Sequence, residues 1–138
     1  MRPWLIDTGP LVALLARNDA QHDWAVDVSK QAPLTVLTCD AVISEALFLL
    51  KRAGHKTHDL FGLVDVGFLR SEFDFHAEYR HVRELMRRYR SRPMAFADAC
   101  LVRMAELRAD ACVWTLDADF GFYRKNRRQT LSLIAPEG

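Results

Sequence analysis

Cysteine is scarce in this sequence, and its three residues form no motif. Cys39, Cys100 and Cys112 are odd in number and widely separated. This pattern favours neither a disulfide framework nor a cysteine-based zinc site. All three lie in apolar stretches, where a buried and reduced thiol is the usual state. We therefore expect a protein of a reducing compartment, the cytoplasm.

Long apolar runs are also missing. No segment approaches the roughly 20 apolar residues that a membrane-spanning helix needs, so we expect no membrane association. The apolar stretch 10–16 follows Arg2 and faintly resembles a secretion signal. Asp7 interrupts the apolar residues between Arg2 and this stretch, and no convincing small-residue cleavage site follows, so we do not expect secretion.

The sequence has neither a phosphate-binding P-loop nor an excess of one charge. No G-x-x-x-x-G-K-[ST] pattern occurs, which argues against the use of nucleoside triphosphates. The formal net charge is only +1, so the total charge says little about partners. The histidine pairs His55/His58 and His76/His81 lack a suitably placed third ligand, so we expect no zinc site.

What the sequence does contain is an alternation of short apolar strands and helices. We predict one soluble domain over residues 1–138. The predicted strands are 4–6, 34–37, 68–73, 111–114 and 131–134, and the predicted helices are 11–16, 19–31, 41–53, 56–66, 77–89 and 95–108. Residues 117–126 read as a short helix or turn. This order predicts an α/β sandwich with a mostly parallel sheet, which binds ligands beyond the carboxyl ends of its strands.

Acidic residues stand where such a sheet would bind a ligand. Asp7 follows the first strand, Asp117 and Asp119 follow the strand 111–114, and Asp98 opens a helix. Each has a plain structural alternative, because an aspartate often caps a helix or interacts with its dipole. Asp117 is closer to the strand, and Asp119 is either a second ligand or a supporting group.

Glu45 is the most telling acid. Its neighbours on the predicted helix, Ala41, Val42, Phe48 and Leu49, are all apolar, so we expect a buried helix and a costly buried carboxylate. Either Arg52, two turns away, or a metal ion can balance this charge.

Carboxylates from distant segments point to hydrolysis assisted by a hard metal ion. Mg²⁺ and Mn²⁺ prefer oxygen ligands, and such an ion can activate water and offset charge on a phosphate. Phosphodiester hydrolysis of this kind needs no Ser, Cys or His nucleophile.

Two basic segments flank the acidic ones and suggest contacts with RNA phosphates. One contains the arginines of residues 80–92, and the other contains Arg124, Lys125, Arg127 and Arg128. A solvated surface is the alternative. Tyr89 and Tyr123 are candidates for base stacking, whereas core packing is the expected role of Phe122. The apolar residues between 60 and 68 are either core or a surface for a protein partner.

The order and spacing of these motifs resemble PIN-domain nucleases, and especially the VapC toxins of bacterial toxin–antitoxin pairs. The resemblance spans essentially the whole chain. Its motifs are Leu5-Ile6-Asp7-Thr8-Gly9-Pro10-Leu11, Ser44-Glu45, Ala97-Asp98-Ala99 and Thr115-Leu116-Asp117-Ala118-Asp119-Phe120. Each motif is weak alone, and together they are fairly specific.

The resemblance implies a three-layer α/β/α fold, Mg²⁺- or Mn²⁺-dependent RNA cleavage, a homodimer and, for toxins, a small antitoxin partner. Carried over by position, Asp7, Glu45, Asp98 and Asp117 become the metal-site acids, and Asp119 is a further candidate ligand. Thr8 and Thr115 become polar helpers.

Three other functions remain open. A housekeeping RNA-processing nuclease would use the same site. A phosphatase would use Asp7 as a covalent nucleophile, but it usually has a second acid where this chain has Gly9. A non-catalytic RNA-binding module would keep an acidic site without turnover.

Overall fold

A parallel sheet forms the centre of the protein. The computed structural model describes residues 2–92 and 94–137. Within these ranges the main sheet has the strand order β3-β2-β1-β4-β7, and all neighbouring strands are parallel. The strands are β1 (Trp4–Ile6), β2 (Val36–Thr38), β3 (Leu69–Ser71), β4 (Cys112–Trp114) and β7 (Ser132–Ile134). The predicted α/β class with a mostly parallel sheet is therefore confirmed.

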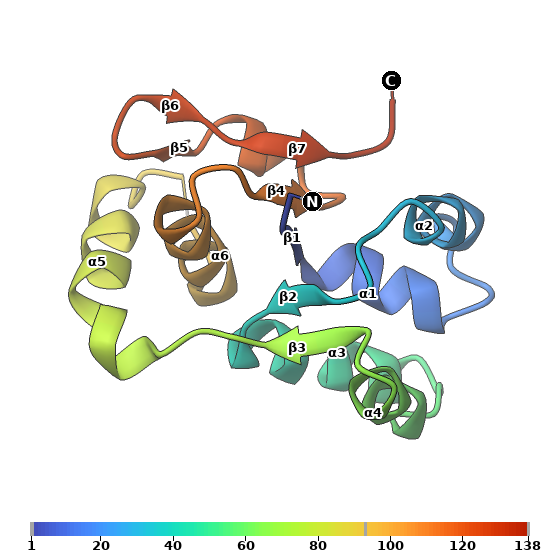
Figure 1. The fold of residues 1–138 in the computed structure, drawn as a ribbon. Helices are drawn as coiled ribbons and strands as arrows, with labels where there is room; N and C mark the ends of the chain where they lie inside the picture. The colour runs from blue at the N-terminus through green and yellow to red at the C-terminus, as the bar shows by residue number, and fades with distance from the viewer. Residues whose placement is uncertain (1, 93, 138) are drawn as a thin grey trace.

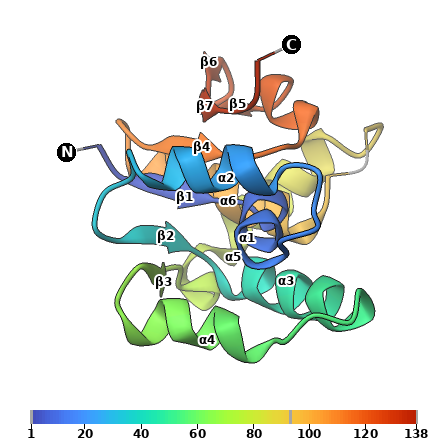
Figure 2. The ribbon, with the colours of Figure 1, turned by 90° about the vertical axis from the view of Figure 1, so that its right-hand side faces the viewer.

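Helices cover both faces of this sheet. They are α1 (Thr8–Leu15), α2 (His22–Ser29), α3 (Asp40–Arg52), α4 (His58–Asp65), α5 (Phe75–Arg88) and α6 (Phe96–Leu107). In Figure 1, α5 and α6 lie on one side of the sheet, and α1 and α2 lie on the other. Figure 2 shows α3 and α4 beside the β2–β3 half, and α3 also packs against α1 and α6. The arrangement is the expected three-layer α/β/α sandwich.

The central strands are buried on both faces. Leu5, Ile6, Val113 and Trp114 are fully buried, as in a parallel sheet covered on both sides. Each of these strands is only three residues long, so the next residue already lies at the edge of the sheet. Asp7 follows β1 in this way, and Thr115 follows β4. The strands thus deliver polar residues to the same edge.

Two local structures differ from the sequence prediction. Helix α1 begins at Thr8 rather than residue 11, because Asp7 caps it and Pro10 fits in the first turn. The segment after Asp117 forms a 3₁₀ turn, η1 (Ala118–Gly121), and then a hairpin of β5 (Arg124–Lys125) and β6 (Gln129–Thr130). The hairpin escaped prediction because no glycine marks its turn.

None of the helices in residues 2–92 and 94–137 has the length and apolarity that a membrane span requires. Cys39, Cys100 and Cys112 are buried and free, as expected.

Candidate active site

Four of the predicted acids surround one cavity at the carboxyl ends of β1 and β4. The cavity has a volume of about 280 Å³. Its lining residues are Asp7, Thr8, Gly9, Glu45, Leu49, Asp98, Leu116 and Asp117. The acids come from the β1–α1 junction, α3, α6 and the segment after β4. The fold therefore brings together residues that are more than 100 positions apart.

Asp7 is the most firmly held of these acids. Its Oδ1 accepts a hydrogen bond from the backbone N–H of Thr8 at 2.8 Å, and its Oδ2 accepts one from Thr115 Oγ1 at 2.7 Å. The residue is only 6% exposed. Burial raises the pKa of Asp7 to about 6 despite these two donors, and the carboxylates of Asp117 and Glu45 add to the effect.

Asp98 is also buried, and a tyrosine holds it. Asp98 is 8% exposed, and the fully buried Tyr123 donates a hydrogen bond from its hydroxyl to Asp98 Oδ2 at 3.1 Å. Burial, followed by the charge of Asp7, raises the pKa of Asp98 to about 7. The pKa of Tyr123 is raised as well, mainly by burial, so its hydroxyl remains a donor.

Glu45 lies in a different environment from the one expected. The predicted buried surround is wrong, because Ser44, Glu45 and Phe48 form an exposed side of α3, while Val42 and Ala46 face the core. Glu45 lines the cavity from this exposed side. No ion pair between Glu45 and Arg52 occurs in residues 2–92 and 94–137.

Asp117 also lines the cavity and is exposed. Its Oδ1 accepts a hydrogen bond from the Asp119 N–H at 2.9 Å, which caps η1. Its own N–H donates to Thr115 Oγ1 at 2.9 Å. Thr115 therefore joins the backbone of Asp117 to the carboxylate of Asp7, and its hydroxyl fixes the relative position of two acids.

Gly9 lets the first turn of α1 pack close to Leu116 at the cavity. A Cβ atom at Gly9 would lie 3.2 Å from Leu116 Cβ and Cδ1. Since Leu116 directly precedes Asp117, the absence of a side chain at Gly9 helps to set the width of the cavity.

The donor set fits a hydrated divalent cation. In the described parts of the chain, no three His, Cys, Asp or Glu side chains are gathered as a ready-made metal cluster. Mg²⁺ usually takes only one or two carboxylates directly and keeps several waters, so a wider ring of acids suits it. The raised pKa values of Asp7 and Asp98 indicate buried carboxylates without a cationic partner. Thr8 Oγ1, also at the cavity, is buried without a hydrogen-bond partner.

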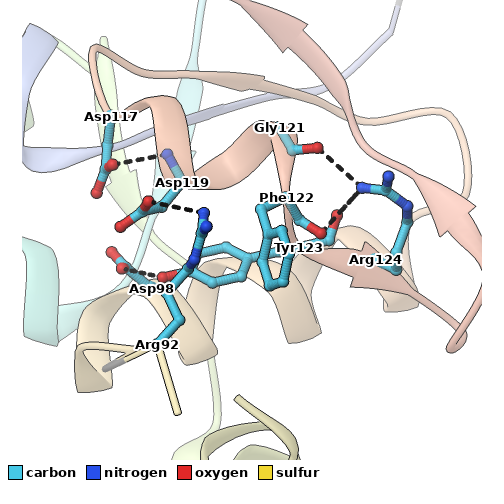
Figure 3. A network of polar contacts seen from close by, with 8 residues as sticks. All are labelled: Arg92, Asp98, Asp117, Asp119, Gly121, Phe122, Tyr123 and Arg124. Carbon is cyan, nitrogen blue, oxygen red and sulfur yellow. Dashed lines mark hydrogen bonds and ion pairs between the residues drawn. The ribbon is translucent and has the colours of Figure 1, made fainter. Parts of the chain in front are cut away.

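Asp119 has a different partner from the other acids. It does not line the cavity, and its Oδ1 lies 3.4 Å from a guanidinium nitrogen of Arg92. Figure 3 shows this pair beside Asp98, Asp117 and Tyr123. In this arrangement Asp119 holds Arg92 beside the cavity. Its role as a metal ligand stays a prediction.

The basic residues of the hairpin divide into two groups. Lys125 is 7% exposed and donates from its ammonium group to the Ala109 carbonyl at 2.7 Å, so its predicted contact with RNA is wrong as the side chain is placed. The guanidinium of Arg124 donates to three carbonyls, those of Gly121, Phe122 and Tyr123 (Figure 3). Arg127 and Arg128 lie at the exposed turn, and their contact with RNA stays a prediction.

The aromatic residues nearby also exchange their expected roles. Phe122, expected in the core, is 46% exposed, whereas Tyr123 is fully buried and Tyr89 is nearly so. Neither tyrosine offers a free ring face to a base. No sequence pattern signals this reversal, because the turn η1 decides which of the two adjacent aromatic residues points inward.

A larger cavity, of about 400 Å³, lies between α5, α6 and the β5–β6 turn. Arg103 in its lining pairs with Glu78 at 2.7 Å and with Glu106 at 3.1 Å. This cavity contains none of the converging carboxylates described above, so size alone does not identify the site.

Several solved structures share this fold. VapC20 of Mycobacterium tuberculosis, described as a Sarcin-Ricin loop cleaving toxin, is 24% identical, with a TM-score of 0.72 over 84% of this chain and 91% of that chain. VapBC2 from Rickettsia felis, solved bound to a DNA fragment from its promoter, is 16% identical, with a TM-score of 0.60 over 96% and 97%. PAE2754 from Pyrobaculum aerophilum is 18% identical, with a TM-score of 0.53 over 96% and 83%. At these identities the likeness establishes the shared fold.

The sequence itself matches a known protein family. No curated protein sequence matches this chain significantly. A family model of the PIN domain matches residues 4–127, which include all four cavity acids. The protein therefore belongs to the PIN-domain family.

Proposed function

We propose that this protein is a divalent-metal-dependent endoribonuclease. The observation that carries the proposal is the convergence of Asp7, Glu45, Asp98 and Asp117 on one cavity. Buried carboxylates without cationic partners are unfavourable, and a divalent cation removes that cost. Asp7, Asp98 and Asp117 would hold Mg²⁺ or Mn²⁺, with Asp119 as a further candidate. When bound, the ion would supply a Lewis acid and lower the pKa of a coordinated water.

The chain's own residues would position the reacting groups. Thr115 and the Thr8 N–H hold both oxygens of Asp7, and Tyr123 holds one oxygen of Asp98. The exposed carboxylate of Glu45 lies at the cavity wall. We infer that Glu45 accepts a proton from the attacking water at a carboxylate oxygen.

The phosphatase alternative is less well supported. A phosphatase of the covalent aspartyl type usually has a second acid two residues after its nucleophile, and this chain has Gly9 there. No Ser, Cys or His lines the cavity to serve as another nucleophile. Direct attack by water on a phosphodiester fits the lining better.

We propose RNA as the substrate and a toxin–antitoxin pair as the biological setting. The solved neighbour VapC20 is described as cleaving the Sarcin-Ricin loop, and VapBC2 was solved on promoter DNA. By analogy, this protein would act in the cytoplasm, form a homodimer and bind a small antitoxin. Exposed Phe61, Val64 and Val66 on and after α4 fit a protein partner.

The direct test is metal-dependent cleavage of RNA by the purified protein. We expect cleavage with Mg²⁺ or Mn²⁺, none with EDTA, and none by Asp7→Asn. Asp110→Asn, which changes an exposed aspartate outside the cavity, is the matched control and should cleave normally. Undiminished cleavage by Asp7→Asn would contradict the proposal. RNA binding without cleavage would favour the non-catalytic module.

Growth distinguishes a toxin from a housekeeping nuclease. Expression of the wild type without its partner should arrest growth, and Asp7→Asn should not. Normal growth with abundant, RNA-cleaving wild-type protein would leave the housekeeping function as the better account.

A further inference from the structure

An exposed arginine lies over an exposed aromatic ring at the rim of the carboxylate cavity. The guanidinium carbon of Arg92 lies 3.9 Å from the centre of the Phe122 ring. A guanidinium nitrogen of Arg92 also lies 3.4 Å from Asp119 Oδ1 (Figure 3). The side chains of Arg92 and Asp119 are 47% and 41% exposed, and Phe122 is 46% exposed. The arginine is thus held at two points while much of its surface faces solvent.

Buried aromatic residues support this stack from within. The ring of Tyr89 packs edge-on against Phe122 at 5.8 Å and against Tyr123 at 5.1 Å. The Tyr89 hydroxyl also accepts a hydrogen bond from the Arg124 N–H at 2.9 Å. An exposed ion pair alone is weak. Here the buried rings of Tyr89 and Tyr123 order Phe122, and Phe122 in turn orders Arg92.

The stack is directly connected to the carboxylates. Asp119 follows Asp117, which lines the cavity, by two residues. Phe122 precedes Tyr123, whose hydroxyl holds Asp98. A substrate strand with one phosphate among the acids would therefore pass this rim.

We propose that Arg92 and Phe122 form a stacking platform for an unpaired base next to the scissile phosphate. The inference rests on the proposed ribonuclease function, and it adds that the substrate is single-stranded at this nucleotide. Guanidinium and aromatic planes bind unstacked bases by their faces, and a base within a duplex has no such face free. The acids repel phosphates, so a contact with a base supplies affinity that the cavity itself does not.

The chemistry of the arginine separates stacking from simple charge attraction. Lysine keeps the positive charge but lacks the planar guanidinium. We expect Arg92→Lys and Arg92→Ala each to weaken binding of a labelled single-stranded RNA about tenfold, or about 1.4 kcal/mol, which is the size of effect that loss of one base stack produces. Phe122→Ala should have a similar effect. Fluorescence anisotropy in EDTA measures this affinity without cleavage.

Arg70→Ala is the matched control. Arg70 on β3 is 67% exposed and pairs with Glu72 at 3.4 Å, the same kind of weak surface pair as Arg92 and Asp119. This variant should bind RNA like the wild type. Wild-type affinity in Arg92→Lys would overturn the platform and reduce Arg92 to a phosphate contact.

Removal of single bases locates the contact. In a series of RNAs with one abasic position each, the effect of Arg92→Ala should disappear at one position, adjacent to the cleavage site mapped with Mg²⁺. An equal effect at every position would overturn the proposal. Failure of the wild type to cleave any RNA would instead contradict the proposed function, so the two failures are distinguishable.

Discussion

Asp7 and Asp98, the inner pair of cavity acids, differ from Glu45 and Asp117, the outer pair, in their contact with water. Asp7 and Asp98 are 6% and 8% exposed, each is held by a neutral hydroxyl group, and each has a raised pKa. Glu45 and Asp117 face solvent from the surrounding walls. The inner pair is held at a free-energy cost to the folded protein, whereas the outer pair costs little. Residues kept at such a cost are candidates for function, and the contrast can be tested by substitution.

The largest effect should come from the inner pair. Asp7→Asn or Asp98→Asn should reduce cleavage by about 1000-fold or more, because a metal ligand is lost within a preorganised site. The same change should raise the melting temperature of the metal-free protein, since it removes a buried charge. Initial cleavage rates and thermal denaturation in EDTA measure the two effects. Lower activity together with lower stability would indicate plain misfolding.

The outer pair should separate activity from stability. Glu45→Gln should slow cleavage by about 100-fold, because the proton acceptor is lost. It should leave the melting temperature of the metal-free protein nearly unchanged, because the charge is already hydrated. Parallel measurements on Asp117→Asn extend the comparison. A stabilisation as large as that of Asp7→Asn would remove the distinction between the pairs.

Tyr123 should have a smaller, indirect effect. Tyr123→Phe removes the donor to Asp98 and so raises the pKa of this acid further. We expect cleavage to fall several-fold near neutral pH and to recover as the pH rises, because Asp98 must be ionised to bind the ion. The pH–rate profiles of the variant and the wild type test this expectation. Profiles that coincide would limit Tyr123 to packing.

The smallest effect concerns the pH dependence of stability without metal. Asp7 and Asp98 have folded pKa values of about 6 and 7, against an ordinary value of 3.8. Between about pH 4 and 7 the folded protein therefore retains protons that the unfolded chain has released. Stability from these groups is present at low pH and is lost as the pH rises through this window. Thermal melts in EDTA should show this trend, and Asp98→Asn should flatten it.

The sequence was sufficient to predict the sheet, the helices and the acids that converge. Apolar strands ending at Asp7 and before Asp117 predicted one edge of a parallel sheet, and the structure places both residues there. The burial of Glu45 was mispredicted because apolar neighbours on a helix do not reveal which side is covered. Phe48, one turn away, is itself 61% exposed.

The residues after Asp117 make contacts that sequence periodicity does not encode. Tyr123 lies 25 residues after Asp98, and only the turn η1 brings its hydroxyl to that acid. Lys125 looked like a surface cation, yet its ammonium group caps the Ala109 carbonyl. Such pairings arise from tertiary packing, so composition alone assigned these residues to the wrong environment.

Proton release during metal binding tests the account most directly. At pH 6.5, pKa values of about 6 and 7 leave Asp7 and Asp98 with about one shared proton, which an incoming cation must displace. Calorimetric titration with Mg²⁺ or Mn²⁺ in two buffers of different ionisation enthalpy counts that proton. We predict release of about one proton at pH 6.5 and almost none at pH 8.5, with binding abolished in Asp7→Asn. Absence of binding at millimolar metal, or binding that Asp7→Asn retains, would contradict the carboxylate cavity as a metal site.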